Sequence, residues 1–349
     1  MPIDKDMPLT EQMKFDLEAE NFSPEEIELM EGDQQLDADG GATITFGAQM
    51  QAPQGHFANL AETMDDGDLA VIVDELLEAY EGDKEARSDW SSTYAEGLSL
   101  MGLKNEDRTE PFPGASGVSH PLLAESVTQF QAQSYKELFP AGGPVKTQIM
   151  GMTNPQVEAQ SKRVKEFMNY QLTHIMEEYE PELDQMLFHL PLSGSAFRKI
   201  YFDDKLGRPV SKFVSSEDLV VPYDSTDLIT CMRITHVIKM PANDVRKYQA
   251  SGFYTDIELG EAYDQENSEV QDRIDELDGA KRVYTKDNIH TILEMHVDLD
   301  LPGYEDANEA GESSGISLPY IVSIDENSSK ILSIRRNYAE QDALKIKKQ

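Results

Sequence analysis

Three side chains that could bind a metal ion recur at even positions of a predicted strand, Ile289–Leu299. They are His290, Glu294 and His296, and alternate residues of a strand point to the same face. Two imidazoles and a carboxylate are donors that zinc accepts in proteins. The opposite face of the strand is apolar, so an amphipathic strand with a polar outer face explains the same pattern. Because no fourth ligand is evident, we predict no metal site and keep these three residues as the candidates.

The other titratable residues give weaker chemical signals. Asp298, Asp300, Glu305 and Asp306 form an acidic run without the order of acids and glycine that an EF-hand requires. His120, His174, His189 and His236 have no serine, cysteine or carboxylate at a spacing typical of catalysis. We therefore predict no catalytic or cofactor-binding residues, no cofactor and no enzymatic activity.

The single cysteine, Cys231, lies in an apolar stretch typical of a strand. We expect a buried structural thiol there, and with no second cysteine the chain cannot form an internal disulfide. The first ten residues, MPIDKDMPLT, lack the basic and apolar regions of a secretion signal, and no run approaches eighteen apolar residues. The sequence thus predicts a protein of the cytoplasm with no membrane partner.

The chain has 349 residues and a formal net charge of −36. The acidic excess is concentrated in residues 1–110, with 28 acids against 6 bases, whereas residues 111–250 are nearly balanced, with 16 against 14. Such a chain repels phosphate groups, so a protein that grips the DNA backbone through Lys and Arg is a poor interpretation. Nucleic acid handled by this protein must slide past it or be held elsewhere.

The first predicted segment is an acidic arm, residues 1–65, with little apolar periodicity. Its composition gives too little apolar area for independent folding. An apolar group at Phe22, Ile27, Leu29 and Met30 is the predicted anchor, and we expect it to contact a neighbouring subunit or another protein that surrounds it.

Residues 66–185 form a predicted helical region. Apolar residues at helical spacing predict four helices, which are Asp68–Tyr80 with a break at Gly82, Lys84–Leu103, Leu122–Phe139 and a long helix from Asn154 to about Glu180. The last helix should bury one stripe of apolar side chains. Its basic residues Lys162, Arg163 and Lys165 are predicted to be a solvated face, although a phosphate contact is an alternative.

Residues 186–260 alternate short apolar runs with turn residues, which predicts a β-meander followed by a helix. The predicted strands are Ala196–Phe202, Val210–Val214, Leu219–Val221 and Cys231–Ile238. Arg198 and Lys199 are neighbours on the first strand and point to opposite faces, so one of them must lie near an interior or an interface. We expect an intersubunit ion pair there.

The last segment, residues 261–349, predicts an acidic helix, Asp264–Leu277, and a further sheet. Its strands are Ile289–Leu299, Leu318–Asp325 and Lys330–Ile334. Helices and a long helix followed by mostly antiparallel strands place the chain in the α+β class.

Several stretches resemble the N-terminal half of the portal proteins of short-tailed bacteriophages. The most specific are VVPYDSTDL at residues 220–228 and RITHVIKMPANDVRKYQASGFY at residues 233–254. The loop and helix PFPGASGVSHPLLAESVTQFQAQSYKELFP, PLSGSAFRKIYFD and LPYIVSIDENSSKILSIRRNY also fit, so the resemblance spans about Pro111 to Tyr338.

The resemblance implies a structural subunit of the portal ring, usually a homododecamer, at one capsid vertex of the virion. Through such a ring double-stranded DNA is packaged and ejected, without sequence-specific contacts. Its partners would be further copies of the chain, the terminase, head–tail adaptor proteins and the major capsid protein, with assembly in the host cytoplasm. This chain would form the outer wing, and the stem and clip regions of portals would follow beyond it.

Two other functions remain open from the sequence. One is a different structural protein of the virion, such as a head–tail adaptor or a scaffold-binding component. The other is a metal-dependent enzyme that uses His290, Glu294 and His296.

Overall fold

The computed structural model describes residues 34–36, 42–44, 55–102, 112, 120–203, 206–260, 268–279, 289–306 and 314–339. The chain divides into two compact units, residues 1–55 and 56–349. In the first unit β1 (Gln34–Leu36) and β2 (Ala42–Ile44) are described, and they pair in antiparallel fashion. The predicted anchor of the arm, Phe22, Ile27, Leu29 and Met30, lies outside the described residues.

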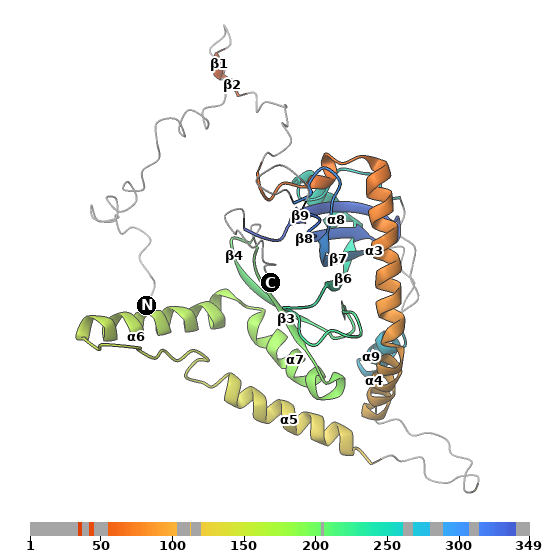
Figure 1. Ribbon diagram of the computed structural model, residues 1–349. Coiled ribbons are helices and arrows are strands. Elements are labelled where there is room, and N and C mark those ends of the chain that lie inside the picture. Colours follow the sequence, from red (N-terminus) through yellow and green to blue (C-terminus); the bar gives the residue numbers. More distant parts are fainter. Residues whose placement is uncertain are drawn as a thin grey trace. The chain divides into compact units, whose positions relative to one another are not determined.

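The second unit is an α+β fold, as the sequence predicts (Figure 1). Its described helices are η1 (Leu60–Glu62), α3 (Asp66–Ala86), α4 (Ser88–Met101), α5 (Leu122–Leu138), α6 (Pro155–Tyr170), the π-helical turn η2 (Gln171–Ile175), α7 (Tyr179–Ser193), α8 (Ala242–Ala250) and α9 (Glu269–Leu277). Its described strands are β3 (Phe197–Asp203), β4 (Arg208–Val214), β5 (Leu219–Val220), β6 (Arg233–Pro241), β7 (Ile289–Leu299), β8 (Leu318–Asp325) and β9 (Lys330–Arg336).

Strands β5 to β9 form one antiparallel sheet in which each strand neighbours the next along the chain. The central strand β7 pairs with β6 from Arg233↔Val297 to Pro241↔Ile289. The predicted boundary at residue 260 therefore does not separate two sheets, because strands from both sides of it share a single ladder. The meander continues across it to the end of β9.

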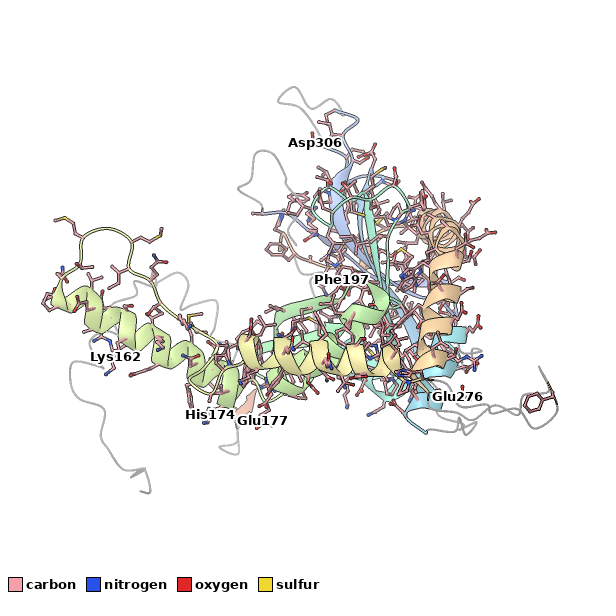
Figure 2. The ribbon with its side chains drawn as sticks, turned by 90° about the horizontal axis from the view of Figure 1, so that it is seen from below. Lys162, His174, Glu177, Phe197, Glu276 and Asp306 are labelled. Atoms are coloured by element: carbon pink, nitrogen blue, oxygen red, sulfur yellow. The ribbon has the colours of Figure 1, made fainter. Side chains whose placement is uncertain are left out.

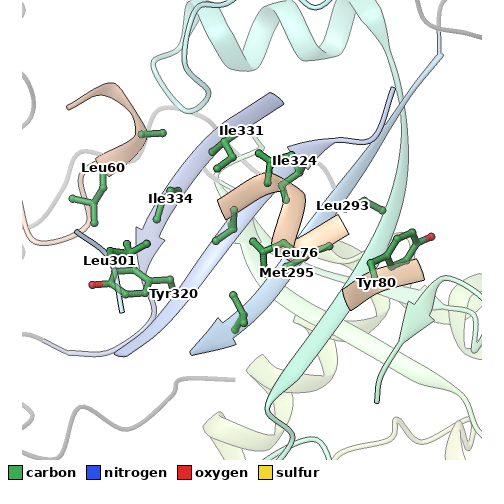
Figure 3. Close-up of a cluster of buried hydrophobic side chains, with 14 of the residues drawn as sticks. Leu60, Leu76, Tyr80, Leu293, Met295, Leu301, Tyr320, Ile324, Ile331 and Ile334 are labelled. Atoms are coloured by element: carbon green, nitrogen blue, oxygen red, sulfur yellow. The ribbon is translucent and has the colours of Figure 1, made fainter. Parts of the chain in front are cut away.

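The main core lies on one face of this sheet (Figure 3). Leu293 and Met295 of β7 are fully buried together with Tyr320 of β8. Against them pack Leu76 and Tyr80 of α3, which lie one helical turn apart. Helix α3 thus covers this face with an apolar stripe while its opposite side faces solvent.

A smaller core covers part of the other face. Ile292 of β7 and Leu332 of β9 are fully buried there, and they pack with Val245 of α8 and with Tyr254. Ile292 and Glu294 are two residues apart on β7, so their side chains point to the same face of the sheet. This face therefore changes from apolar to polar within two residues. The polar region is the first part of the candidate site described below.

The first two predicted meander strands are not part of this sheet. Strands β3 and β4 pair only with each other, from Phe197↔Val214 to Asp203↔Arg208, as a separate hairpin. Helix α7 packs along β4, and Glu178 and Glu182 accept hydrogen bonds from the backbone N–H groups of Ser211 and Phe213, at 3.3 and 2.7 Å. Carboxylates therefore occupy N–H groups at the outer edge of β4, where a further strand would otherwise pair.

Two helix boundaries differ from the sequence prediction. The helix α3 continues through Gly82, where a side chain would meet open space, and the break to α4 comes at Arg87. The predicted long helix from Asn154 to Glu180 is instead α6, a π-turn and α7, and Met176 does not continue the helix. Of the apolar stripe predicted to be buried along it, α6 buries no residue.

The N-terminal arm is shorter than predicted, because residues 56–65 belong to the second unit. Asn59 is buried against β9: its Oδ1 accepts from the N–H of Ile334 at 3.0 Å, and its Nδ2 donates to the carbonyl of Leu332 at 3.2 Å. The guanidinium of Arg336 donates to the carbonyl of His56 at 3.0 Å. This segment therefore follows the edge strand and supplies its backbone groups with partners.

Candidate functional site

The first part of the candidate site is a polar cluster between the β3–β4 hairpin and the five-stranded sheet. Lys199 of β3 donates to Glu294 Oε1 of β7 at 2.5 Å. His296 Nε2 donates to the same oxygen at 3.3 Å, and Asn337 Nδ2 donates to His296 Nδ1 at 3.4 Å. The cluster joins side chains from residues 199 to 337, and it contains the only described ion pair between the hairpin and β7.

Burial and charge have opposite effects on Glu294. Burial alone would raise the pKa of its carboxyl group, but the hydrogen bond from His296 and the charge of Lys199 together lower this pKa to about 2. His236 faces Glu294 across the β6–β7 ladder. Burial, reinforced by the positive charge of Lys199, lowers the pKa of His236 to about 4. Near neutral pH the cluster therefore holds a carboxylate and a lysine ammonium beside a neutral imidazole of His236.

The ion pair predicts a specific loss of stability in acid. The pKa of Glu294 is lower in the folded protein than in the unfolded chain, where it is about 4.3. Its contribution is thus present above about pH 4.5 and is lost as the pH falls toward 2. Since both side chains keep some solvent contact, at 34% and 21% exposure, we expect about 1–2 kcal/mol. Glu294→Gln should lower the free energy of unfolding by this amount at pH 7, and by progressively less down to pH 3.

Urea unfolding followed by circular dichroism at several pH values measures this difference. Glu96→Gln is the matched control, because Glu96 is an exposed glutamate of α4. It should leave the pH dependence unchanged. If Glu294→Gln and the parent protein lose stability in parallel between pH 5 and pH 3, the assigned role of Glu294 is wrong.

The three candidate metal ligands do not converge. His290 is buried and its Nδ1 donates to Asp325 Oδ1 at 3.1 Å, whereas Glu294 and His296 contact each other. Residues four apart on a strand are about 13 Å apart along it, so His290 cannot share a metal ion with the other two. Among the described residues no three histidine, cysteine or acidic side chains form a group that could hold a metal ion.

Arg198 and Lys199 both find partners within their own chain. Lys199 pairs with Glu294, and Arg198 Nη2 donates to the carbonyl of Tyr179 at 2.8 Å while its guanidinium lies 4.2 Å from the centre of the Tyr179 ring. The two side chains contact β7 and α7, and the expected intersubunit ion pair stays a prediction. Cys231 is buried, as expected, although it lies just before β6.

The second part of the candidate site is an exposed helical arm, residues 144–170, which consists of α6 and the extended segment before it. The segment is held by Asn169, which bonds both backbone groups of Val145, and by Ser161, whose hydroxyl donates to that of Thr147 at 2.8 Å. Residues 145–150 form no strand and pair with no described strand. Figure 2 shows the side chains around Lys162 on this arm.

The arm exposes large apolar side chains. Met150 and Met152 are 91% and 92% exposed, and Phe167 is 61% exposed. Val164, Met168 and Tyr170 of α6 are also about half exposed. Within the described residues, α6 has substantial contact with no helix or strand apart from η2, which continues it. Exposed apolar groups of this density are typical of a surface that another molecule covers.

Sequence reasoning missed this surface, because the helical spacing of its apolar residues predicted an internal stripe. The signal that could have found it is the basic group Lys162, Arg163 and Lys165, which surrounds the apolar stripe on the same helix. Among the described helices none is long and apolar enough to cross a membrane.

Comparison with known protein families finds no family that matches the chain, and comparison with curated proteins finds no relative.

Proposed function

We propose that this chain is the structural subunit of a phage portal ring at the capsid vertex, through which the genome is packaged and ejected. The proposal starts from the motifs at residues 220–228 and 233–254, which resemble portal proteins. The observation that carries it is the exposed arm. A 16-residue helix that buries none of its side chains in its own chain gains its stability from packing on something else.

The arrangement of charge agrees with such a role. A passage for DNA must not hold the phosphate backbone, and a chain with a net charge of −36 repels phosphate overall. The cations of the folded core are also occupied: Lys199, Arg208 and Arg233 pair with Glu294, Glu178 and Asp83. These three cations hold elements of the protein together, so they are not free to grip a polyanion.

As a portal subunit the chain would assemble with copies of itself, and the ring would bind the terminase during packaging and head–tail adaptors afterwards. The second candidate, another structural protein of the virion, is favoured by the same exposed arm, because an adaptor also needs a surface for neighbouring subunits. The symmetry of the assembly distinguishes the two: the portal proposal requires a closed ring, expected to be about twelvefold.

Native mass spectrometry and electron microscopy of the purified full chain test the proposal. We expect a closed oligomer of about twelve copies with rotational symmetry and a central opening. A chain that stays monomeric or dimeric up to about 100 µM, well above the range of stable oligomer contacts, would contradict it. A closed oligomer without a central opening would favour the second candidate.

A further inference from the structure

The exposed face of α6 combines apolar and basic side chains. Arg163, Phe167 and Tyr170 follow one another at intervals of four and three residues, so they form one ridge along the helix. Val164 and Met168 form the adjoining ridge, and both ridges face solvent. A partner that packs on α6 therefore covers an apolar surface and meets at least one guanidinium.

The charge of the arm is opposite to that of the chain. Residues 144–170 contain four basic and two acidic residues, whereas the whole chain has a net charge of −36. Lys162, Arg163 and Lys165 are all exposed. Lys162 has a partner in Glu166, but the two charged groups are 3.8 Å apart and largely exposed to water, so the pair is weak. The chemistry of this face thus fits an acidic partner.

The outer face of α3 has that chemistry. It is 21 residues long, or about 31 Å, and its solvent side carries six exposed carboxylates. These are Asp68, Asp74, Glu75, Glu78, Glu81 and Glu85. Within the described part of the chain none of them takes part in an ion pair. Val71, which is 67% exposed, adds an apolar contact near the start of the helix.

We infer that α6 of one subunit packs along the outer face of α3 of a second copy of this chain. This inference rests on the proposed function, since it names the surfaces at which ring neighbours meet. Helices of about 24 and 31 Å can lie side by side over most of their length. Phe167 and Tyr170 would then be covered with Arg163, on the same ridge, facing the carboxylates, while Lys162 and Lys165 on other sides of α6 add to its positive charge.

Such a contact has a consequence for symmetry. The two faces belong to different parts of the subunit, so each copy offers one α6 and receives one on its α3. A contact between unlike surfaces adds copies head to tail, and it ends only when the rotation closes a ring. A twofold dimer, in which one surface meets its own copy, would not use this pair of helices.

A charge-reversal exchange tests the contact. The first variant is Lys162→Glu, Arg163→Glu and Lys165→Glu, and the second is Glu75→Lys, Glu78→Lys and Glu81→Lys. Each variant alone places like charges at every contact, so the concentration at which half of the chains are assembled should rise at least tenfold. In an equimolar mixture the acidic α6 of the first variant meets the basic α3 of the second, and the basic α6 meets the acidic α3. The mixture should therefore assemble near the concentration of the unaltered chain.

Analytical ultracentrifugation measures assembly, and circular dichroism confirms that each variant folds, since all six residues are exposed. If the unaltered chain forms a ring and both variants do so equally well, the α6–α3 contact is wrong and the proposed function stands. If the unaltered chain forms no ring, the proposed function and this inference both fail.

Two further outcomes would overturn the inference by showing another occupant of α6. If only the first variant fails to assemble, and removal of residues 1–54 has the same effect, the acidic N-terminal segment covers α6. If instead the first variant assembles normally but loses binding to a 30-base-pair duplex DNA, the arm faces nucleic acid.

Discussion

Replacing Asp325 with alanine is expected to lower the free energy of unfolding by about 3–5 kcal/mol. Asp325 is fully buried at the end of β8, and one oxygen accepts from His290 Nδ1 at 3.1 Å. The other accepts from the backbone N–H and the hydroxyl of Ser328, at 3.0 and 2.6 Å, and so fixes the turn into β9. Alanine leaves the His290 N–H buried without a partner and frees the turn.

Urea unfolding at pH 7 measures this effect. Asp256→Ala is the matched control, because Asp256 is exposed in the loop after α8, and it should change stability by less than about 0.5 kcal/mol. Asp325→Asn should fall between the two, since one amide oxygen can satisfy either His290 or Ser328. An Asp325→Ala protein within about 1 kcal/mol of the parent would show that this hairpin does not depend on the buried pair.

Replacing Arg87 with methionine is expected to cost about 2–4 kcal/mol. Arg87 lies at the junction of α3 and α4, and its guanidinium donates to the carbonyls of Ser216, Glu217 and Leu219 at 2.9, 2.5 and 3.1 Å. Burial raises the pKa of the Glu217 and Asp218 carboxyl groups, and the charge of Arg87 opposes this rise. Methionine keeps the apolar stem but leaves three carbonyls without their donor, and it removes one of the positive charges near Glu217 and Asp218.

Thermal and urea unfolding should separate Arg87→Met from two related variants. Lys84→Met removes an exposed cation one turn earlier and should be nearly neutral. Arg87→Lys keeps the charge but cannot reach three carbonyls with one planar group, so we expect an intermediate loss. Equal stability of the methionine and lysine variants would mean that the charge is irrelevant and only the stem contributes.

The sequence predicts local structure well wherever one periodicity dominates. The predicted bounds of β7 and β8 agree with the structure. In both segments the pattern of apolar residues fits a strand and no other secondary structure. The break between α3 and α4 was misplaced for a physical reason: Gly82 lies on an exposed side of the helix, where glycine costs only about 1 kcal/mol. The break at Arg87 depends on carbonyls about 130 residues away.

Long-range partners explain the other differences. Lys199 and Glu294 are 95 residues apart, and the local pattern gives no indication that a hairpin strand meets the central strand of another sheet. Likewise, the apolar stripe of α6 has the same spacing whether its own core or another molecule covers it. The three candidate metal ligands do not meet, because the alternation of a strand predicts which side chains share a face but not that they are close enough to bind one ion. The resemblance to portal proteins remains a prediction.

The attachment of Asn59 to β9 determines how the folded unit would carry mechanical load. Any tension on the chain before residue 55 reaches the folded unit first at His56 and Asn59, whose hydrogen bonds to Leu332, Ile334 and Arg336 share it with the edge strand. From there β9 passes the force to β8 and β7 through their ladder. Tension on the chain before residue 55 would therefore strain the whole sheet at once, rather than peel away a single loop.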